Sequence, residues 1–428
     1  MRVLVIGSGG REHALVWRVA RDPAVGAILA CPGNPGIGQL AQLVPSAMDA
    51  AALVALAVRE RIDLTIVGPE LPLSEGVADV FQARGLPIVG PTRAAAALET
   101  SKIFAKAFMS RHGIPTARYR VCETEEQARG LLARAELGWP VVVKADGLAA
   151  GKGVIVAPDE TAALEAVAAM MRDRRFGSAG ARVVLEECLE GPELSVFVLS
   201  DGERTVPIGT AQDHKRVGDG DRGPNTGGMG AFAPSPLSDA SLHARIIREI
   251  VDPVIRGMRE EGAPYAGFLY CGLMLTREGP RVIEFNVRFG DPEAQVVLPL
   301  LTGDVLGALR AAADGDLRGV RIGVSDDRAV GVVLASGGYP DRYEPGHPIT
   351  GVDETAALPG VVVFHAGTAM RDGRLVTAGG RVLTIVGRGA DFHAARDRAY
   401  EAASRVSFDG LHMRRDIGLK AVSITGNA

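Results

Sequence analysis

Three short apolar runs, each ending at a turn that contains glycine, mark the first hundred residues. They cover residues 3–6, 27–30 and 64–67. Strands of a parallel sheet give nearly continuous apolar runs, because helices cover both of their faces. The pattern therefore predicts a Rossmann-like α/β domain with a parallel sheet over residues 1–100. The turns should gather at the carboxyl edge of that sheet, where ligands of α/β folds bind.

A different pattern begins near residue 101. Two β-branched runs, 141–143 and 154–156, enclose a loop rich in Gly and Ala, which predicts a hairpin. From about residue 329, short strands precede an amphipathic helix that begins at Asp391 and runs through Val406. The patterns predict a central domain over 101–326 and a small C-terminal α+β domain over 327–428.

Composition narrows the class of protein. The 428 residues are 47% apolar and carry a net charge of −4, which provides a sizeable core but no basic field for nucleic acid. The four cysteines lie far apart without metal-type spacing, as in a reducing compartment. No apolar run is long enough to span a bilayer. We expect a cytoplasmic protein with neither membrane nor nucleic-acid partners.

The hairpin loop has the chemistry of a phosphate site. Lys144 ends its first strand, and Gly151, Lys152 and Gly153 lie in the loop. Glycines let backbone N–H groups approach an anion, and the two ammonium groups supply charge. An ordinary loop is the alternative. The spacing is not that of a Walker loop, because no Gly-Lys-Ser/Thr opens a helix here.

The first turn is a second candidate anion site. Gly9 and Gly10 lead into a helix, whose free N–H groups and dipole favour a negative ligand. A dinucleotide fold is the rival interpretation. However, Glu12 stands where its third small residue belongs, and no acidic residue for a ribose follows the second strand. A small phosphate ester fits better.

The most informative local pattern is the strand VIEFNVRF at 282–289. Alternation places Glu284, Asn286 and Arg288 on one face, with Ile283 among the apolar residues on the other. A carboxylate and an amide oxygen suit Mg²⁺ shared with substrate phosphates, and a guanidinium suits a carboxylate or acyl phosphate. A polar surface strand is the alternative, but it does not explain the turn that begins at Gly290.

Taken together, the motifs resemble those of the phosphoribosylamine–glycine ligases, a family of ATP-grasp enzymes in purine biosynthesis. The resemblance covers nearly the whole chain and rests on VIGSGGREHAL, PGNPG, VVKADGLAAGKGV, QDHKR, GPNTGGMGAF and RFGDPE. It implies an ATP-grasp centre of two lobes, with a lid subdomain at about 121–190. It also implies ligation of glycine to 5-phosphoribosylamine, with ATP as co-substrate and glycyl phosphate as intermediate.

The resemblance further assigns roles to residues. Those implied to hold ATP are Lys102, Lys144, Gly151, Lys152, Gly153, Glu186, Glu187, Leu189 and Glu193. Glu284 and Asn286 would bind Mg²⁺ or Mn²⁺. Those implied to handle glycine and the transferred phosphoryl group are Arg288, Asp213 and Lys215. Those implied to bind the phosphoribosylamine side are Gly9, Gly10, Arg11, Asn34, Gly36 and Asp291.

Two alternatives stay open at this point. Another ATP-grasp ligase, such as a biotin carboxylase or a formate-using transformylase, would share Glu284, Asn286 and Arg288 but not the RFGDPE context. A nucleotide-binding regulator without activity would have no need for both metal ligands and Arg288. The partners expected are small molecules alone, with the chain a monomer or weak dimer.

Overall fold

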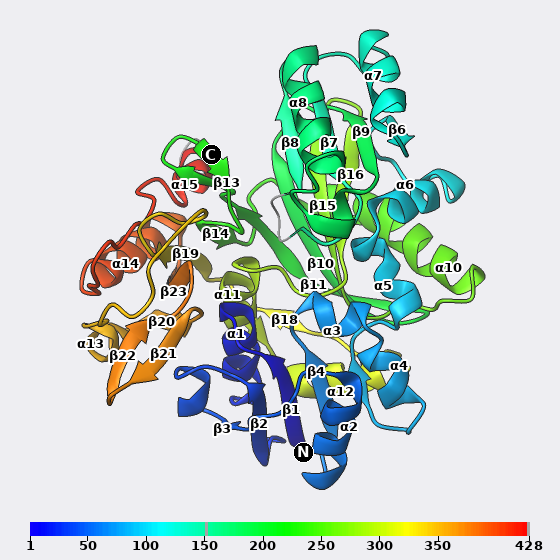
Figure 1. The fold of residues 1–428 in the computed structure, drawn as a ribbon. Helices are drawn as coiled ribbons and strands as arrows, with labels where there is room; N and C mark the ends of the chain where they lie inside the picture. Colours follow the sequence, from blue (N-terminus) through cyan, green and yellow to red (C-terminus); the bar gives the residue numbers. More distant parts are fainter. Residues whose placement is uncertain (150–152, 426–428) are drawn as a thin grey trace.

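The N-terminal part of the computed structural model, which describes residues 1–149 and 153–425, is a five-stranded parallel sheet (Figure 1). Its strand order is β3-β2-β1-β4-β5, and β1 lies at the centre between β2 and β4. The bounds are β1 Arg2–Gly7, β2 Ala27–Pro32, β3 Gln42–Leu43, β4 Leu64–Val67 and β5 Ile88–Val89. The parallel-sheet prediction is confirmed.

Helices cover this sheet and lead out of it. Their bounds are α1 Gly10–Val19, α2 Ala50–Arg59, α3 Glu70–Ser74, α4 Val77–Gln82, α5 Arg93–Thr100 and α6 Lys102–Arg111. The side chain of Ser101 accepts a hydrogen bond from the Phe104 N–H and so caps α6. The break between α5 and α6 therefore lies where the chain passes from the first domain to the second.

A smaller antiparallel sheet of order β6-β9-β7-β8 contains the central hairpin, and we call this sheet with its helices the lid, after the subdomain expected at about 121–190. Its strands are β6 Tyr119–Cys122, β7 Val141–Ala145, β8 Val154–Ala157 and β9 Val183–Glu187. Helices α7 Glu125–Ala133 and α8 Glu160–Met171 share one apolar core with it, at the top of Figure 1. Lys144 pairs with Val154 across the hairpin.

An eight-stranded antiparallel sheet runs through the rest of the molecule in the order β16-β15-β10-β11-β14-β19-β23-β20. Its strands are β10 Glu193–Asp201, β11 Thr205–Asp213, β14 Gly230–Ala233, β15 Ala266–Thr276, β16 Gly279–Asn286, β19 Arg328–Ala335, β20 Val361–His365 and β23 Arg381–Gly389. Because β14 pairs with β19, the sheet continues across the boundary expected near residue 327.

The remaining elements frame this sheet. The helices are α9 Ala240–Ile246, α10 Asp252–Glu260, α11 Glu293–Val297, α12 Val305–Ala313, α13 Val352–Ala356 and α15 Leu419–Thr425. Two-stranded sheets complete the set: β12 Arg216–Gly218 with β13 Arg222–Asn225, β17 Leu301–Thr302 with β18 Gly323–Val324, and β21 Thr368–Arg371 with β22 Arg374–Thr377. Within the described ranges, no helix has the length and apolar content needed to cross a membrane.

The amphipathic helix near the C-terminus is α14, Phe392–Ala403. Asp391 caps it by accepting from the Ala394 N–H at 2.8 Å, as predicted. The helix ends three residues before the predicted Val406, because the chain turns there and buries Val406 in the core of the C-terminal domain.

Candidate active site

Strand β16 carries the two predicted metal ligands, and a β-bulge determines which of its side chains lie on each face. The register against β15 shifts between Gly272 and Leu273, so that Ile283 is the extra residue. Val282 instead lies in the buried core with Phe285, and the placement of Ile283 on that face was wrong. The freed carbonyl of Ile283 accepts a hydrogen bond from Lys144 Nζ at 3.1 Å.

Glu284 faces a group of cations. Burial alone would raise its pKa, but Lys215, Lys144 and Lys102 outweigh that effect and hold the pKa of Glu284 below its usual value. The Glu284 side chain is therefore ionised. Lys102, whose pKa is lowered mainly by burial, also donates to the Gly147 carbonyl at 3.2 Å and so contacts the lid hairpin.

The donor set of β16 fits a hard cation. Hydrogen bonding assigns the amide nitrogen of Asn286 to the side of the Phe285 carbonyl, 3.2 Å away, and of the Glu99 carboxylate, 3.1 Å away. The amide oxygen consequently points away from the Glu99 carboxylate. One carboxylate and one amide oxygen suffice for Mg²⁺ or Mn²⁺ when substrate phosphates complete the coordination. The ion would supply charge neutralisation for those phosphates.

Lys144 also belongs to a buried ionic cluster that sequence reasoning only partly found. Glu186 Oε2 lies 3.0 Å from Lys144 Nζ and 2.8 Å from Lys106 Nζ. Burial lowers the pKa of Lys106 to about 8, opposed by Glu186. The other oxygen, Oε1, is buried without a hydrogen-bond partner among the described residues. The sequence left the lysines of α6 either solvated or directed at phosphates, and Lys106 is instead buried and paired with Glu186.

The other predicted nucleotide residues lie along the strand ends beside this cluster. Glu187 accepts from Arg118 Nε at 2.6 Å, and the half-buried Leu189 follows β9. Glu193, the first residue of β10, is 2.9 Å from Lys215 Nζ. A Cβ at Gly153 would lie 2.7 Å from that of Ala149. Gly151 and Lys152 lie outside the described residues.

Asp213 ends β11 and faces Lys215 together with several carboxylates. Burial raises the pKa of Asp213 to about 7, an effect that Lys215 opposes and Glu293 and Glu193 reinforce. Burial lowers the pKa of Lys215, but Glu193 and Asp213 outweigh that effect and hold the pKa well above its usual value. Lys215 is therefore a cation, while Asp213 can exchange a proton near neutral pH.

Two hydrogen bonds and an ion pair hold the guanidinium of Arg288. Its Nε donates to Glu70 at 3.1 Å, Nη1 donates to the Phe289 carbonyl at 3.2 Å, and Nη2 lies 3.0 Å from Glu99 Oε1. Burial opposes the charge, but the two carboxylates raise the pKa of Arg288 above its usual value. Glu70 and Glu99 come from α3 and α5 of the first domain and were not predicted. An Arg-to-Glu pair between distant segments leaves no spacing signal.

Glu12 explains why the first turn departs from the dinucleotide pattern. Its carboxylate accepts from the Gly9 N–H and from Arg11 Nε, each at 2.6 Å. A Cβ at Gly68 would lie 2.0 Å from Glu12 Oε1. The Glu12 side chain thus fills the space beneath the turn that a third small residue would leave free, and it holds Arg11 in place.

This turn lies against the loop that follows β16. A Cβ placed on Gly9 would be 3.4 Å from Asp291 Oδ2, and one on Gly10 would be 2.5 Å from Gln295 Nε2. Helices α1 and α11 accordingly lie side by side, at the centre of Figure 1. The first turn, where an anion site was predicted, therefore lies next to the RFGDPE motif.

Asn34 and Gly36 tie the second turn to the C-terminal domain. Asn34 Nδ2 donates to the carbonyls of Ser8 at 2.8 Å and His365 at 2.9 Å. A Cβ on Gly36 would lie 2.5 Å from ring atoms of both His13 and His365. The Asn34 amide holds the loops beside the first turn, and Gly36 lets the two imidazoles approach.

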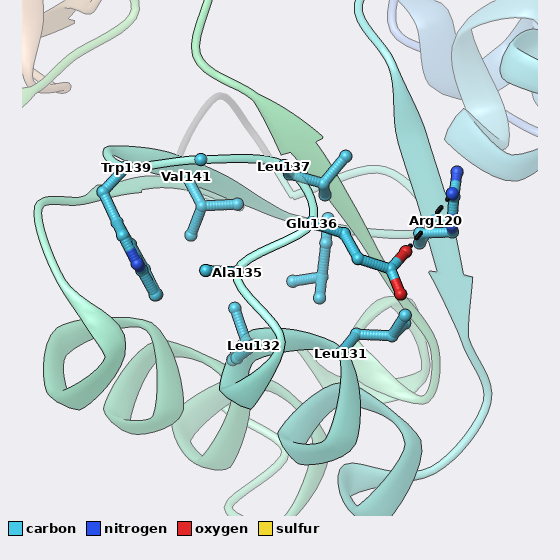
Figure 2. A pocket seen from close by; sticks show the side chains of 10 residues that line it. Arg120, Leu131, Leu132, Ala135, Glu136, Leu137, Trp139 and Val141 are labelled. Atoms are coloured by element: carbon cyan, nitrogen blue, oxygen red, sulfur yellow. Dashed lines mark ion pairs between the residues drawn. The ribbon is translucent and has the colours of Figure 1, made fainter.

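The enclosed pocket shown in Figure 2 is not part of this site. It lies in the lid between α7, the loop with Trp139, and strands β7 and β9, and Leu131 and Leu132 point into it. Its rim carries the ion pair of Arg120 with Glu136, at 3.3 Å. A cavity of about 10 Å³ has room for one water molecule at most.

Comparison with known proteins fits this combination of sites. Sequence models of the phosphoribosylglycinamide synthetase N domain, ATP-grasp (A) domain and C domain match residues 1–99, 100–294 and 329–420. The chain belongs to the phosphoribosylglycinamide synthetase family. It is consequently an ATP-grasp ligase, and it uses ATP with Mg²⁺ or Mn²⁺, as that family does.

Individual relatives agree over the full length. The phosphoribosylamine–glycine ligase of Ralstonia nicotianae is 50% identical over 99% of this chain and 100% of its own. That of Pseudomonas aeruginosa is 51% identical over 99% of both chains. The crystal structure of the Thermotoga maritima ligase superposes with a TM-score of 0.85 at 36% identity, covering 97% of this chain and 100% of that one.

The biotin carboxylases, the alternative ATP-grasp family, are similar to this chain in structure but not in sequence. The biotin carboxylase of Campylobacter jejuni superposes with a TM-score of 0.74 over 100% of this chain and 96% of its own, but at 16% identity. That likeness extends to the fold alone. The three-domain architecture with an ATP-grasp centre is confirmed by the Thermotoga maritima ligase, and the biotin carboxylase shares it at low sequence identity.

Proposed function

We propose that this chain ligates glycine to 5-phosphoribosylamine, with conversion of ATP to ADP and phosphate, and that the site described above carries out the reaction. The product is glycinamide ribonucleotide, an intermediate of purine biosynthesis. The observation that carries the proposal is the meeting of three features along residues 284–291. These are the cation cluster around Glu284, the guanidinium of Arg288, and the anion-binding turn whose Gly9 adjoins Asp291.

In this proposal the ATP phosphates lie against Lys102 and Lys144, under the hairpin that includes Gly153. Glu186, Glu187 and Leu189 line the adenine edge, and Glu193 faces the ribose. The buried Glu186 Oε1, without a protein partner among the described residues, supports a polar ligand there. Gly151 and Lys152 keep their proposed role in the loop, although they lie outside the described residues.

The chemistry requires two steps. The carboxylate of glycine first takes the γ-phosphoryl group of ATP to give glycyl phosphate, and the amine of phosphoribosylamine then displaces phosphate. Arg288 would bind the glycine carboxylate and stabilise the oxyanion, using N–H groups beyond those that its two hydrogen bonds and its ion pair occupy. Asp213 and Lys215 would position glycine and the transferring phosphoryl group. Glu284 and Asn286 would hold the metal ion.

The phosphoribosyl group would bind at the first turn. The backbone N–H of Gly10 at the start of α1 suits a phosphate, and Arg11 adds charge. The N–H of Gly9 is bonded to Glu12, which leaves Gly9 to provide a close approach. Asn34 would act by holding the neighbouring loops, since its amide bonds to two protein carbonyls. Gly36 provides the close packing beside it.

Some parts of the proposal concern the whole protein. We place the domain divisions at 100/101 and 326/327. The separate sheets of the first domain and the lid support the first division, whereas the eight-stranded sheet crosses the second. A cytoplasmic location is supported by the four cysteines, all of which are free thiols. We further propose that the chain acts as a monomer or weak dimer.

The decisive experiment measures ADP release with ATP, Mg²⁺, glycine and phosphoribosylamine, leaving out each substrate in turn. We expect turnover with the complete mixture and at least about a tenfold loss without either glycine or phosphoribosylamine. Equal ADP release when bicarbonate replaces glycine, or independence of both substrates, would contradict the proposal.

A further inference from the structure

Arg381, the first residue of β23, reaches the candidate site from the C-terminal domain. Its Nη1 donates to the carbonyl oxygens of Gly227 and Asp291, each at 2.7 Å, and its Nη2 lies 3.3 Å from Asp291 Oδ1. The side chain is 21% exposed. One guanidinium therefore joins the glycine-rich loop 223–230 to the turn that follows Arg288.

The loop is built to accept this contact. A Cβ on Gly227 would lie 3.0 Å from Arg381 Cζ, and one on Gly228 would lie 2.4 Å from the ring of Pro292. The hydroxyl of Tyr339, also from the C-terminal domain, accepts from the Gly227 N–H at 3.0 Å. Larger residues at 227 and 228 would push the loop away from Arg381 and from the turn.

The contact with Arg381 also fixes the orientation of the Asp291 carboxylate. Oδ1 accepts from Gln295 Nε2 at 2.8 Å and pairs with Arg381. Oδ2 is the oxygen 3.4 Å from the position of a Cβ on Gly9. Burial raises the pKa of Asp291, but Arg381 and Arg11 outweigh that effect and keep the pKa below its usual value. The group is thus an anion whose second oxygen faces the first turn.

We propose that Arg381 is a positioning residue. It fixes the glycine-rich loop and turns Asp291 Oδ2 toward the amino group of the substrate bound at Gly9, so that a carboxylate oxygen accepts an N–H of that amine. The C-terminal domain thereby completes the site for the second half of the reaction. This inference rests on the proposed function, because it assigns phosphoribosylamine to the turn at Gly9.

The test compares Arg381→Met and Arg381→Lys with Arg388→Met. Arg388 is a matched control on the same strand, 28% exposed and paired with Asp327 at 2.8 Å. Loss of a charged hydrogen-bonding group predicts that Arg381→Met raises the KM for phosphoribosylamine and lowers kcat, each by about tenfold or more. ATP affinity measured by calorimetry should stay within about twofold. Arg381→Lys should lie between, because an ammonium cannot span both carbonyls.

A second comparison adds Asp291→Asn. If Arg381 acts through Asp291, removing Arg381 costs less in the Asp291→Asn background than in the native chain. Additive losses, kinetics of Arg381→Met that match those of Arg388→Met, or an equal loss of ATP affinity would each overturn the inference. Should Arg381→Met not fold, native kinetics in Arg381→Lys would overturn it. A native enzyme that needs neither glycine nor phosphoribosylamine would instead refute the proposed function.

Discussion

Individual side chains of the site compensate one another's charge within the protein. Arg288 is held by Glu70 and Glu99, and Lys144 shares Glu186 with Lys106. Buried charges are stable only when paired, so the orientation of each cationic side chain is fixed before the substrates bind. The substrates then meet groups that need little rearrangement, which is how a site stabilises developing charge without covalent chemistry.

Replacing Arg288 by lysine tests the proposed glycine site. The shorter reach of an ammonium and its single charged nitrogen cannot keep the contacts to Glu70 and Glu99 while binding a carboxylate. Arg288→Lys should reduce turnover by about a hundredfold and raise the KM for glycine, with ATP binding near native in calorimetry. An equal loss of ATP affinity would move Arg288 to the nucleotide phosphates.

Replacing Glu284 by glutamine separates metal binding from packing. The neutral amide keeps the shape but weakens the proposed Mg²⁺ site, so activity should fall on the order of a hundredfold and recover partly at high Mg²⁺. Because the surrounding lysines stabilise the ionised carboxylate, the protein without nucleotide should also melt at a lower temperature. Activity that metal titration does not change would assign Glu284 a structural role.

At the scale of elements, the periodic segments could be predicted and the contacts between them could not. In the predicted amphipathic helix, now α14, the residues at the spacing of one helix face are all buried, because a helix fixes its own spacing; they are Phe392, Ala395, Ala399 and Ala402. Glu284 and Asn286 lie on one face of β16 as predicted, because the alternation of side chains along a strand is also a local property. The bulge at Ile283 was missed, since it depends on the partner strand β15.

The residues of the site that sequence reasoning missed share one property. Glu70, Glu99 and Arg381 each act on a motif that is far away in the chain, and none lies within a motif itself. A charged residue on a helix or at the start of a strand is usually solvated, so its type alone indicates no role. Their roles follow from tertiary contacts alone.

A single methyl group tests the packing between the turn after β2 and strand β20. In Gly36→Ala the new Cβ would lie 2.5 Å from ring atoms of His13 and His365, which must shift. Overpacking of this kind costs about 1 to 3 kcal/mol. Denaturant unfolding should show that loss, whereas Gly26→Ala, where the nearest atom is 3.6 Å away, should stay within about 0.5 kcal/mol. Equal stability of the two variants would contradict the packing argument.

At the scale of the molecule, the first and last domains meet through buried imidazoles. The backbone N–H of His365 donates to His13 Nδ1 at 2.8 Å. Burial lowers the pKa of His13 to about 3, reinforced by His365, and lowers the pKa of His365 to about 4. Phe364 packs edge-on against His13, and Thr368 bonds the His365 ring. Both rings are therefore neutral in the folded protein.

This interface predicts a loss of stability in acid. The unfolded chain takes up protons near pH 6.5, whereas the folded histidines resist them until about pH 3 to 4, so stability should fall as pH drops through that window. At about 1.4 kcal/mol per unit of pKa difference, the loss is on the order of a few kcal/mol for each histidine. Melting temperatures from pH 8 to 4 should show the decline, and His13→Gln, which cannot be protonated, should make the slope shallower. An unchanged slope would show that other groups dominate.

The shared eight-stranded sheet has a consequence for synthesis of the chain. Strand β14 pairs on one side with β11 and on the other with β19, which is translated roughly a hundred residues later. At ribosomal rates of about 5 to 20 residues per second, the unpaired edge of β14 waits roughly 5 to 20 s for its neighbour. Exposed strand edges recruit other strands, so the nascent protein passes through an aggregation-prone interval that ends only when β19 leaves the ribosome.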